Sequence, residues 1–132
     1  MQFYNIAIFF LSFDKNLIMA YDELLADRVR QQLKDKKASF EERKMFGGLC
    51  FLVDEKMCVG VVKNNLMTRV DPEIYEQLLE EKGARKMDFT HRPMKGFIFV
   101  KPEGVDLDDD LGKWVQYCLD FNPKAKSSKT KK

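Results

Sequence analysis

The residues best suited to chemistry in this 132-residue chain are basic side chains gathered in one short segment, Thr90 to Gly96. The segment holds Arg92, Lys95 and His91, which is the only histidine of the sequence. Proline at position 93 restricts the backbone, and arginine offers a fork of N–H donors that fits a carboxylate or a phosphate. This exposed turn is therefore the best candidate in the sequence for binding an anionic group. Further basic residues that could join it are Arg43, Lys44 and Arg85.

The favoured interpretation of this segment is a structural turn, in which Arg92 pairs with an acid such as Asp88 or Glu103. Both readings place polar groups at a bend between two strands. They differ in whether the cations are free to meet a ligand, because an arginine already paired with a carboxylate has fewer donors to offer.

A metal centre, a cofactor or a catalytic nucleophile is not predicted. The cysteines have no C-x-x-C spacing and stand in apolar segments, at positions 50, 58 and 118. The acids between Asp106 and Asp110 do not fit a calcium loop, because its glycine and final glutamate positions hold Leu111 and Tyr117. A helix start stabilised by carboxylates is the favoured interpretation. We expect a protein that is not an enzyme, and an enzyme with an unrecognised site is the alternative.

Charge is distributed unevenly along the chain. The whole sequence has 23 basic and 21 acidic residues, but residues 122–132 hold five lysines and no acid, so the remainder has 18 basic residues (23 − 5) and a net charge of −3 (18 − 21). Binding of a nucleic-acid backbone requires clustered positive charge. We therefore expect any nucleic-acid affinity to be weak and to reside in a disordered basic tail over 122–132. The tail lysines are Lys124, Lys126, Lys129, Lys131 and Lys132.

Residues 1–18 do not resemble the rest of the chain. Phe3 to Phe13 is an almost wholly apolar run that is too short to span a bilayer, and it lacks the basic start of a signal peptide. Met19 stands just before a capped helix, so translation from Met1 or from Met19 is equally compatible with the domain that follows. We expect residues 1–18 to be an extension from an upstream start or from cloning. The alternatives are an apolar arm packed on the domain and a membrane anchor.

The thiols and the absence of a recognisable secretory signal predict a cytoplasmic protein.

Apolar periodicity and turn residues outline the elements that position these groups. A helix is predicted over Asp22 to Lys37, a second from Asp71 to Gly83, and a third that opens at Asp106 to Asp110. Strands are predicted at 44–46, 49–53, 57–62, 66–70 and 95–100, with a bend at Gly47 and Gly48.

The order is helix, three or four strands, helix, one or two strands, helix. It lacks the regular alternation of a parallel sheet, so we predict an α+β domain with an antiparallel sheet of about five strands and three helices. Several strands are apolar on both faces, and three helices are too few to cover both. An uncovered apolar face would be a partner surface, and a homodimer is one such partner.

Two segments resemble the signature segments of the TfoX N-terminal domain family: Met45-Phe46-Gly47-Gly48-Leu49-Cys50-Phe51, and the stretch from Met87 to Phe97. The resemblance extends from Met19 to Phe121, so it implies one domain over 19–121 with the α+β fold. Members are named after bacterial regulators of natural competence. The full-length regulators carry a second, helical domain and act with the cyclic-AMP receptor protein at promoters.

The chain ends after the first of those domains, so the resemblance implies the fold more strongly than a role in transcription. We expect a non-enzymatic regulatory module that acts through protein contacts on its sheet face and its Arg92/Lys95 turn. The alternative is weak nucleic-acid binding by the tail.

Overall fold

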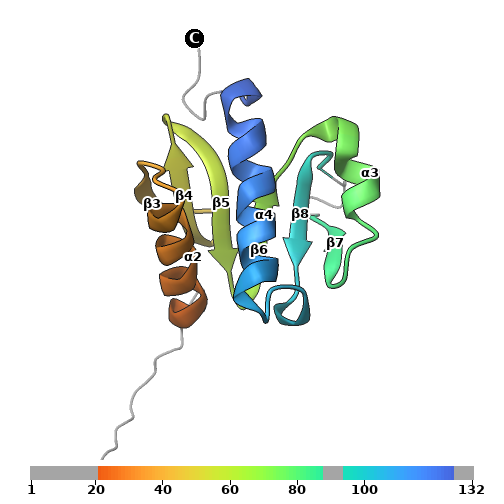
Figure 1. The fold of residues 1–132 in the computed structure, drawn as a ribbon, viewed down its shortest axis with the longest axis horizontal. Helices are drawn as coiled ribbons and strands as arrows, with labels where there is room; N and C mark the ends of the chain where they lie inside the picture. The colour runs from red at the N-terminus through yellow and green to blue at the C-terminus, as the bar shows by residue number, and fades with distance from the viewer. Residues whose placement is uncertain (1–20, 88–93, 127–132) are drawn as a thin grey trace, which may run out of the picture.

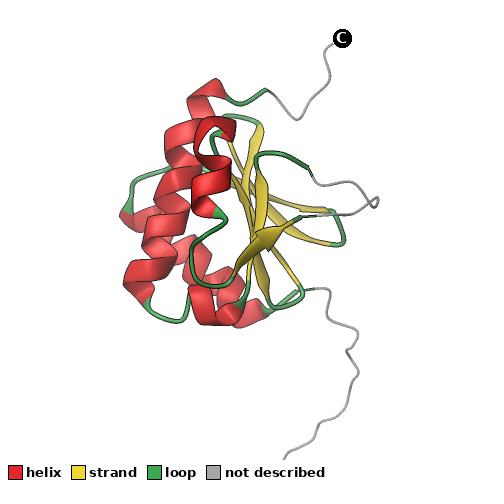
Figure 2. Cartoon of the chain, turned by 90° about the vertical axis from the view of Figure 1, so that its right-hand side faces the viewer, coloured by secondary structure: helices red, strands yellow, loops and turns green. Residues whose placement is uncertain are grey.

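A six-stranded antiparallel sheet forms the centre of the computed structural model, which describes residues 21–87 and 94–126. All helices of the described residues lie on one face of this sheet (Figure 1; Figure 2). The opposite face is called the helix-free face below. The strands, in the order in which they lie side by side, are β3 (Glu41–Met45), β4 (Gly48–Val53), β5 (Lys56–Val62), β6 (Asn65–Arg69), β8 (Phe97–Val100) and β7 (Ala84–Lys86). The helices are α2 (Glu23–Asp35), α3 (Tyr75–Leu78) and α4 (Asp108–Phe121). The predicted α+β fold and its element order are confirmed.

Helix α2 forms where the sequence predicts it, because its first turn is capped and one face is apolar. The Asp22 carboxylate accepts hydrogen bonds from the backbone N–H groups of Leu24 and Leu25, at 2.9 and 3.1 Å. The helix ends at Asp35, two residues before the predicted end. Lys37 has a φ of 62°, so the chain leaves the helix through a left-handed residue. The residues that α2 buries are Leu25, Ala26, Val29 and Leu33.

The middle helix is much shorter than the predicted Asp71 to Gly83. After its Asp71 cap, the chain makes a 3₁₀ turn over Pro72–Ile74 and then the single helical turn of α3. Gly83 has a φ of 80°, and its carbonyl accepts a hydrogen bond from the Lys101 N–H at 2.9 Å. This reversal starts strand β7 at Ala84. The helix is cut short because the chain must return to pair with β8.

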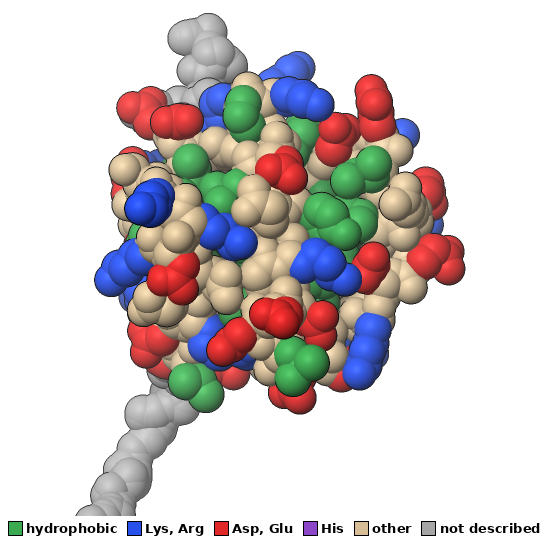
Figure 3. All heavy atoms as spheres, viewed as in Figure 1, with side chains coloured by type: hydrophobic (Ala, Val, Ile, Leu, Met, Phe, Trp, Pro, Cys, Tyr) green, Lys and Arg blue, Asp and Glu red, His purple; other side chains and the backbone are tan. Residues whose placement is uncertain are grey.

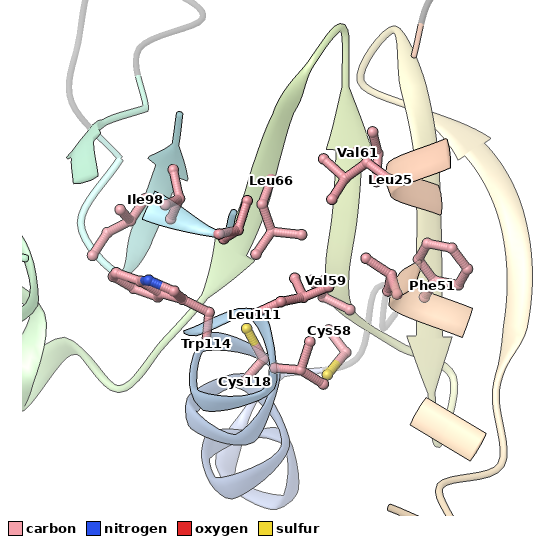
Figure 4. Close-up of a cluster of buried hydrophobic side chains, with 14 of the residues drawn as sticks. Leu25, Phe51, Cys58, Val59, Val61, Leu66, Ile98, Leu111, Trp114 and Cys118 are labelled. Atoms are coloured by element: carbon pink, nitrogen blue, oxygen red, sulfur yellow. The ribbon is translucent and has the colours of Figure 1, made fainter. Parts of the chain in front are cut away.

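The main core lies between the helices and the sheet. Figure 4 shows Trp114 reaching from α4 toward Ile98 of β8. Trp114 is only 1% exposed, and its ring meets the ring of Tyr117 edge-on, with centroids 5.6 Å apart. Burial of large apolar side chains on this scale is the principal source of stability for a domain of this size. Other members of this cluster are Leu25, Phe51, Val59, Val61, Leu66, Leu111 and Val115.

A second, smaller apolar cluster lies on the helix-free face, and it bears on one prediction. Its core members are buried although no helix of the described chain covers them: Cys50, Leu52, Met57, Val62, Met67, Met87 and Phe99. The partly buried side chains of Met45, Met94 and Phe97 pack against this cluster. The described helices leave this face of the sheet without a helix, as predicted, but its apolar side chains are buried rather than exposed. The homodimer stays a prediction, without the exposed apolar surface that suggested it.

The folded body continues past Phe121, where the sequence placed its end. Residues Asn122–Lys124 form a 3₁₀ turn, and the buried Asn122 side chain donates a hydrogen bond from Nδ2 to the Val53 carbonyl at 3.0 Å. Lys56 Nζ donates to the Asn122 carbonyl at 3.2 Å. Ala125 is buried as well. These contacts hold the first residues of the predicted tail, whereas Lys129, Lys131 and Lys132 lie outside the described residues.

Candidate binding surface

The structure separates the basic residues that the sequence grouped together. Arg43 and Lys44 lie on β3 and Arg85 lies on β7, which are the two edge strands of the sheet. Figure 1 shows these strands on opposite sides of the domain. Neighbouring strands lie about 4.8 Å apart, so five steps separate the edges by roughly 24 Å along the sheet. The turn before β8 is four steps from β3, or roughly 19 Å along the sheet, so Arg43 and Lys44 do not adjoin Lys95, the described basic residue of that turn.

The predicted turn itself is described only in part. Lys95 is exposed in the turn that leads into β8. His91 and Arg92 lie outside the described residues, so their roles stay predictions. Arg43 is paired with Glu41 on its own strand at 3.1 Å, which leaves it fewer donors for a ligand.

Two arginines that the sequence analysis did not connect lie on either side of β8. Arg69 of β6 is the cross-strand partner of Phe97, and Arg85 of β7 is the partner of Phe99. The guanidinium carbon of Arg69 is 5.6 Å from the Phe97 ring centroid, and that of Arg85 is 5.1 Å from the Phe99 ring centroid. Both distances fit cation–π contacts. We call these four residues the arginine–phenylalanine surface.

The register of the strands places this surface on the helix-free face. Phe99 belongs to the second cluster and Phe97 packs against it. Side chains of directly paired residues point to the same face of a sheet. Arg69 and Arg85 therefore share the helix-free face with the rings that they cover. In the sequence, Phe97 and Phe99 stand at alternate positions of β8, and Arg69 is the last residue of the apolar strand β6. Only the pairing of β6, β8 and β7 brings these phenylalanines and arginines together.

The strands of the described chain carry more positive than negative charge on this face. Arg43 pairs with Cys50 and Glu41 with Leu52, and both of these partners belong to the second cluster. The charged strand residues that share the face are thus Glu41, Arg43, Arg69 and Arg85. Glu41 is occupied by Arg43. On the helix side, by contrast, acids and bases are interspersed over the surface (Figure 3).

Burial affects the two arginines differently. Arg85 is exposed, whereas Arg69 is partly buried, and its Nη1 donates a hydrogen bond to the Met57 carbonyl at 3.3 Å. Burial lowers the pKa of the Arg69 guanidinium from its ordinary value. Arginine stays protonated at physiological pH despite such a shift, so both groups act as permanent cations.

The helix side has an open groove of about 450 Å³ between α2 and α4. Its walls mix acids with lysines, and Lys113 is already paired with Glu81 at 2.9 Å. Gly112 forms part of the floor, and a Cβ there would lie 2.9 Å from Gln32 Oε1. The groove holds no thiol. Its lining is Gln32, Lys36, Asp108, Asp109, Gly112, Lys113, Gln116, Tyr117 and Asp120.

The thiols are poorly placed for nucleophilic chemistry. All three are buried, and none forms a disulfide: Cys50, Cys58 and Cys118. Burial raises the pKa of the Cys50 and Cys58 thiols from 9.0 to about 12, and it raises that of Cys118 as well. The reactive thiolate is therefore scarce at neutral pH.

We expect none of the three thiols to react rapidly with a thiol reagent such as DTNB at pH 8 in the native protein. All three should react when guanidinium unfolds the chain. A thiol with a raised folded pKa stabilises the fold fully below its unfolded pKa, and this contribution is lost as pH rises through the folded value. Stability should thus fall between about pH 9 and pH 12. A native thiol that reacts as fast as free cysteine would contradict the described burial.

Two further observations concern the described residues only. No helix there is long and apolar enough to cross a membrane. No group of three or more His, Cys, Asp or Glu side chains in that part of the chain is placed to hold a metal ion.

No curated protein matches the chain. The family model of the TfoX N-terminal domain matches residues 31–122, which is more than half of the 132 residues. The match begins within α2 and ends at the buried Asn122, so it includes the whole sheet and α4. The chain therefore belongs to the TfoX N-terminal domain family.

Proposed function

We propose that this chain is a cytoplasmic, non-enzymatic regulatory module that binds another protein through the helix-free face of its sheet. The observation that carries the proposal is the contrast between the two faces. One face is covered by helices, while the other presents the arginine–phenylalanine surface over a small closed core. Aromatic residues and arginine are the types most enriched at the centres of protein interfaces.

The chemistry of the described groups supports binding rather than turnover. Arginine cannot give up its proton at physiological pH, so Arg69 and Arg85 can hold an anion but cannot act as an acid or a base. The free thiols, which also suit a reducing compartment, are buried and have raised pKa values. Family membership supports a regulatory role, because the family takes its name from regulators of competence.

The test is site-specific photo-crosslinking in the native host, with a photoreactive amino acid placed at one position of the full chain at a time. Lys95 is exposed beside the arginine–phenylalanine surface, whereas Gln116 is exposed on α4. Adducts are identified by mass spectrometry. We expect a discrete protein adduct from position 95 and none from position 116. Adducts from position 116 alone, adducts to nucleic acid, or no discrete adduct from position 95 would each overturn the proposal.

The second candidate is weak nucleic-acid binding through the basic tail. Lys126 is exposed and has no interaction within the described chain, whereas Lys124 lies 3.4 Å from Asp71. The test compares the full chain with a chain that ends at Lys126, because an end at Phe121 would remove the buried Asn122. Both are titrated against labelled DNA and RNA at several salt concentrations.

Removal of residues 127–132 takes away three lysines. For double-stranded DNA, we expect the slope of log affinity against log salt to become less steep by about 2.7, which is 0.9 for each lost phosphate contact. Equal affinity of the two chains at physiological salt would instead place the nucleic-acid site on the folded body.

A further inference from the structure

We infer that the helix-free face receives an acidic polypeptide segment, with Arg69 and Arg85 as two carboxylate receptors on either side of the Phe97–Phe99 ridge. The inference rests on the proposed function and specifies the chemistry of the partner. It is carried by three features of the described chain, which are the pairing state of the arginines, their contacts with the two phenylalanine rings and the spacing between them.

The pairing state distinguishes these two arginines from the others. The described chain has five arginines, and three of them are paired with acids. Arg28 binds Asp108 at 3.1 Å, Arg30 binds Glu42 at 2.9 Å and Arg43 binds Glu41 at 3.1 Å. Within the described chain, Arg69 and Arg85 have no carboxylate partner. The two unpaired guanidinium groups are the two on the arginine–phenylalanine surface.

The ring contacts leave both groups able to bind a carboxylate. A cation–π contact is made to the face of the ring and consumes none of the N–H donors of a guanidinium. Arg69 uses only one donor group, on the Met57 carbonyl. The ring contacts also restrict the arginine rotamers before the partner arrives, which reduces the entropy cost of binding. A carboxylate can then form a two-point contact with each group.

The distance between Arg69 and Arg85 determines how far apart the two carboxylates of the partner segment must be. Arg69 and Arg85 stand on the two neighbours of β8, opposite residues that are two apart along it. With about 4.8 Å between strands and 3.4 Å per residue, their backbones lie roughly 12 Å apart. An extended segment covers that distance in about four residues, and a helix in about eight. The fitting segment has two carboxylates at such a spacing, with an apolar side chain between them to meet Phe97.

A single nucleic-acid strand fits this surface less well. Aromatic rings on a sheet can stack bases, but stacking requires an open ring face. Phe99 is only 7% exposed, and the Arg85 guanidinium lies over its ring. The folded chain without its tail lysines also carries net negative charge, which disfavours a polyanion with many phosphates. A short segment with two carboxylates avoids both obstacles.

The experiment is a fluorescence anisotropy titration of the full chain with a labelled peptide in which glutamate recurs at every fourth residue, leucine stands midway between successive glutamates and serine fills the other positions, so that an extended peptide presents glutamate and leucine on the same face. A second peptide has lysine at every glutamate position, and a labelled twelve-nucleotide oligothymidine is the third probe. We expect only the acidic peptide to bind. The double variant Arg69→Gln and Arg85→Gln should weaken binding at least about tenfold, because two charge-assisted contacts are lost.

Two variants serve as controls. Arg43→Gln removes an arginine from the same face that is already paired with Glu41, so it should change affinity less than about twofold. Arg85→Gln alone changes an exposed residue, so it reports on the surface even if Arg69→Gln impairs folding. We expect it to weaken binding about threefold to tenfold.

Equal binding of the lysine peptide, no loss of affinity in Arg85→Gln, or oligothymidine binding that depends on the two arginines would each overturn the inference. Failure of the acidic peptide to bind would overturn it too. If crosslinking from position 95 still yields a protein adduct in that case, the proposed function stands and only the acidic chemistry of the partner is rejected.

Discussion

Replacement of Trp114 by alanine is expected to lower the free energy of unfolding by about 3–5 kcal/mol. Trp114 is 1% exposed and lies where α4 crosses the sheet, among side chains from β6 and β8 (Figure 4). Alanine would leave a cavity that a rigid sheet and a long helix cannot refill. Domains of this kind are stable by only about 5–15 kcal/mol, so the variant should be close to unfolding. Urea denaturation followed by circular dichroism measures the change.

The matched control is Leu107→Ala, which removes a large apolar side chain just before the same helix. Leu107 is 64% exposed, so its loss should change the free energy of unfolding by less than about 0.5 kcal/mol. If Trp114→Ala were no more destabilising than Leu107→Ala, α4 would not be docked on the sheet as described.

The elements that could be predicted from the sequence are those with local causes. Asp22 caps α2 through its own neighbours, and the apolar residues of that helix recur at helical spacing. The hairpin turns are also local. Asp54 and Glu55 both have positive φ values, as a two-residue hairpin turn of type I′ requires, and they stand between the strands predicted at 49–53 and 57–62.

The elements that could not be predicted depend on residues far apart in the sequence. Helix α3 is short because Gly83 must bond to Lys101, 18 residues later, so that β7 can pair with β8. Asn122 belongs to the folded body because its partner is the carbonyl of Val53 in β4. Neither contact leaves a periodic pattern. Composition alone made residues after Phe121 look like part of a disordered tail.

In the candidate site too, local features could be predicted from the sequence, whereas contacts between distant residues could not. Basic residues were predicted to form one site from their positions along the chain, and this prediction joined Arg43 to residues at the opposite edge of the sheet. Arg69 and Arg85 are 16 residues apart, and only the strand order β6–β8–β7 places them on either side of two phenylalanines. Their positive charge was visible from the sequence, but the absence of nearby acids depends on the tertiary structure.

The adjacent glycines at positions 47 and 48 provide the second large prediction, because the fold requires each for a different reason. A Cβ on Gly48 would lie far inside the contact distance of the Val61 carbonyl oxygen and 2.9 Å from Val62 Cγ2. That carbonyl belongs to β5, where Leu49 pairs with Val61, so it cannot retreat without breaking the ladder between β4 and β5. We expect Gly48→Ala to cost about 3 kcal/mol or more, at or beyond the upper end for overpacked sites.

Gly47 is the internal control, because it has open space around it. A Cβ there would meet nothing within 4 Å, but the residue has a φ of 74° in the turn between β3 and β4. Alanine can adopt that conformation at a cost of about 1–2 kcal/mol. Urea denaturation should therefore rank Gly48→Ala well below Gly47→Ala in stability. If Gly47→Ala were the less stable variant, backbone conformation, rather than the close approach of β5, would be the main reason why glycine is required at these two positions. The separation between β4 and β5 would then be wider than described.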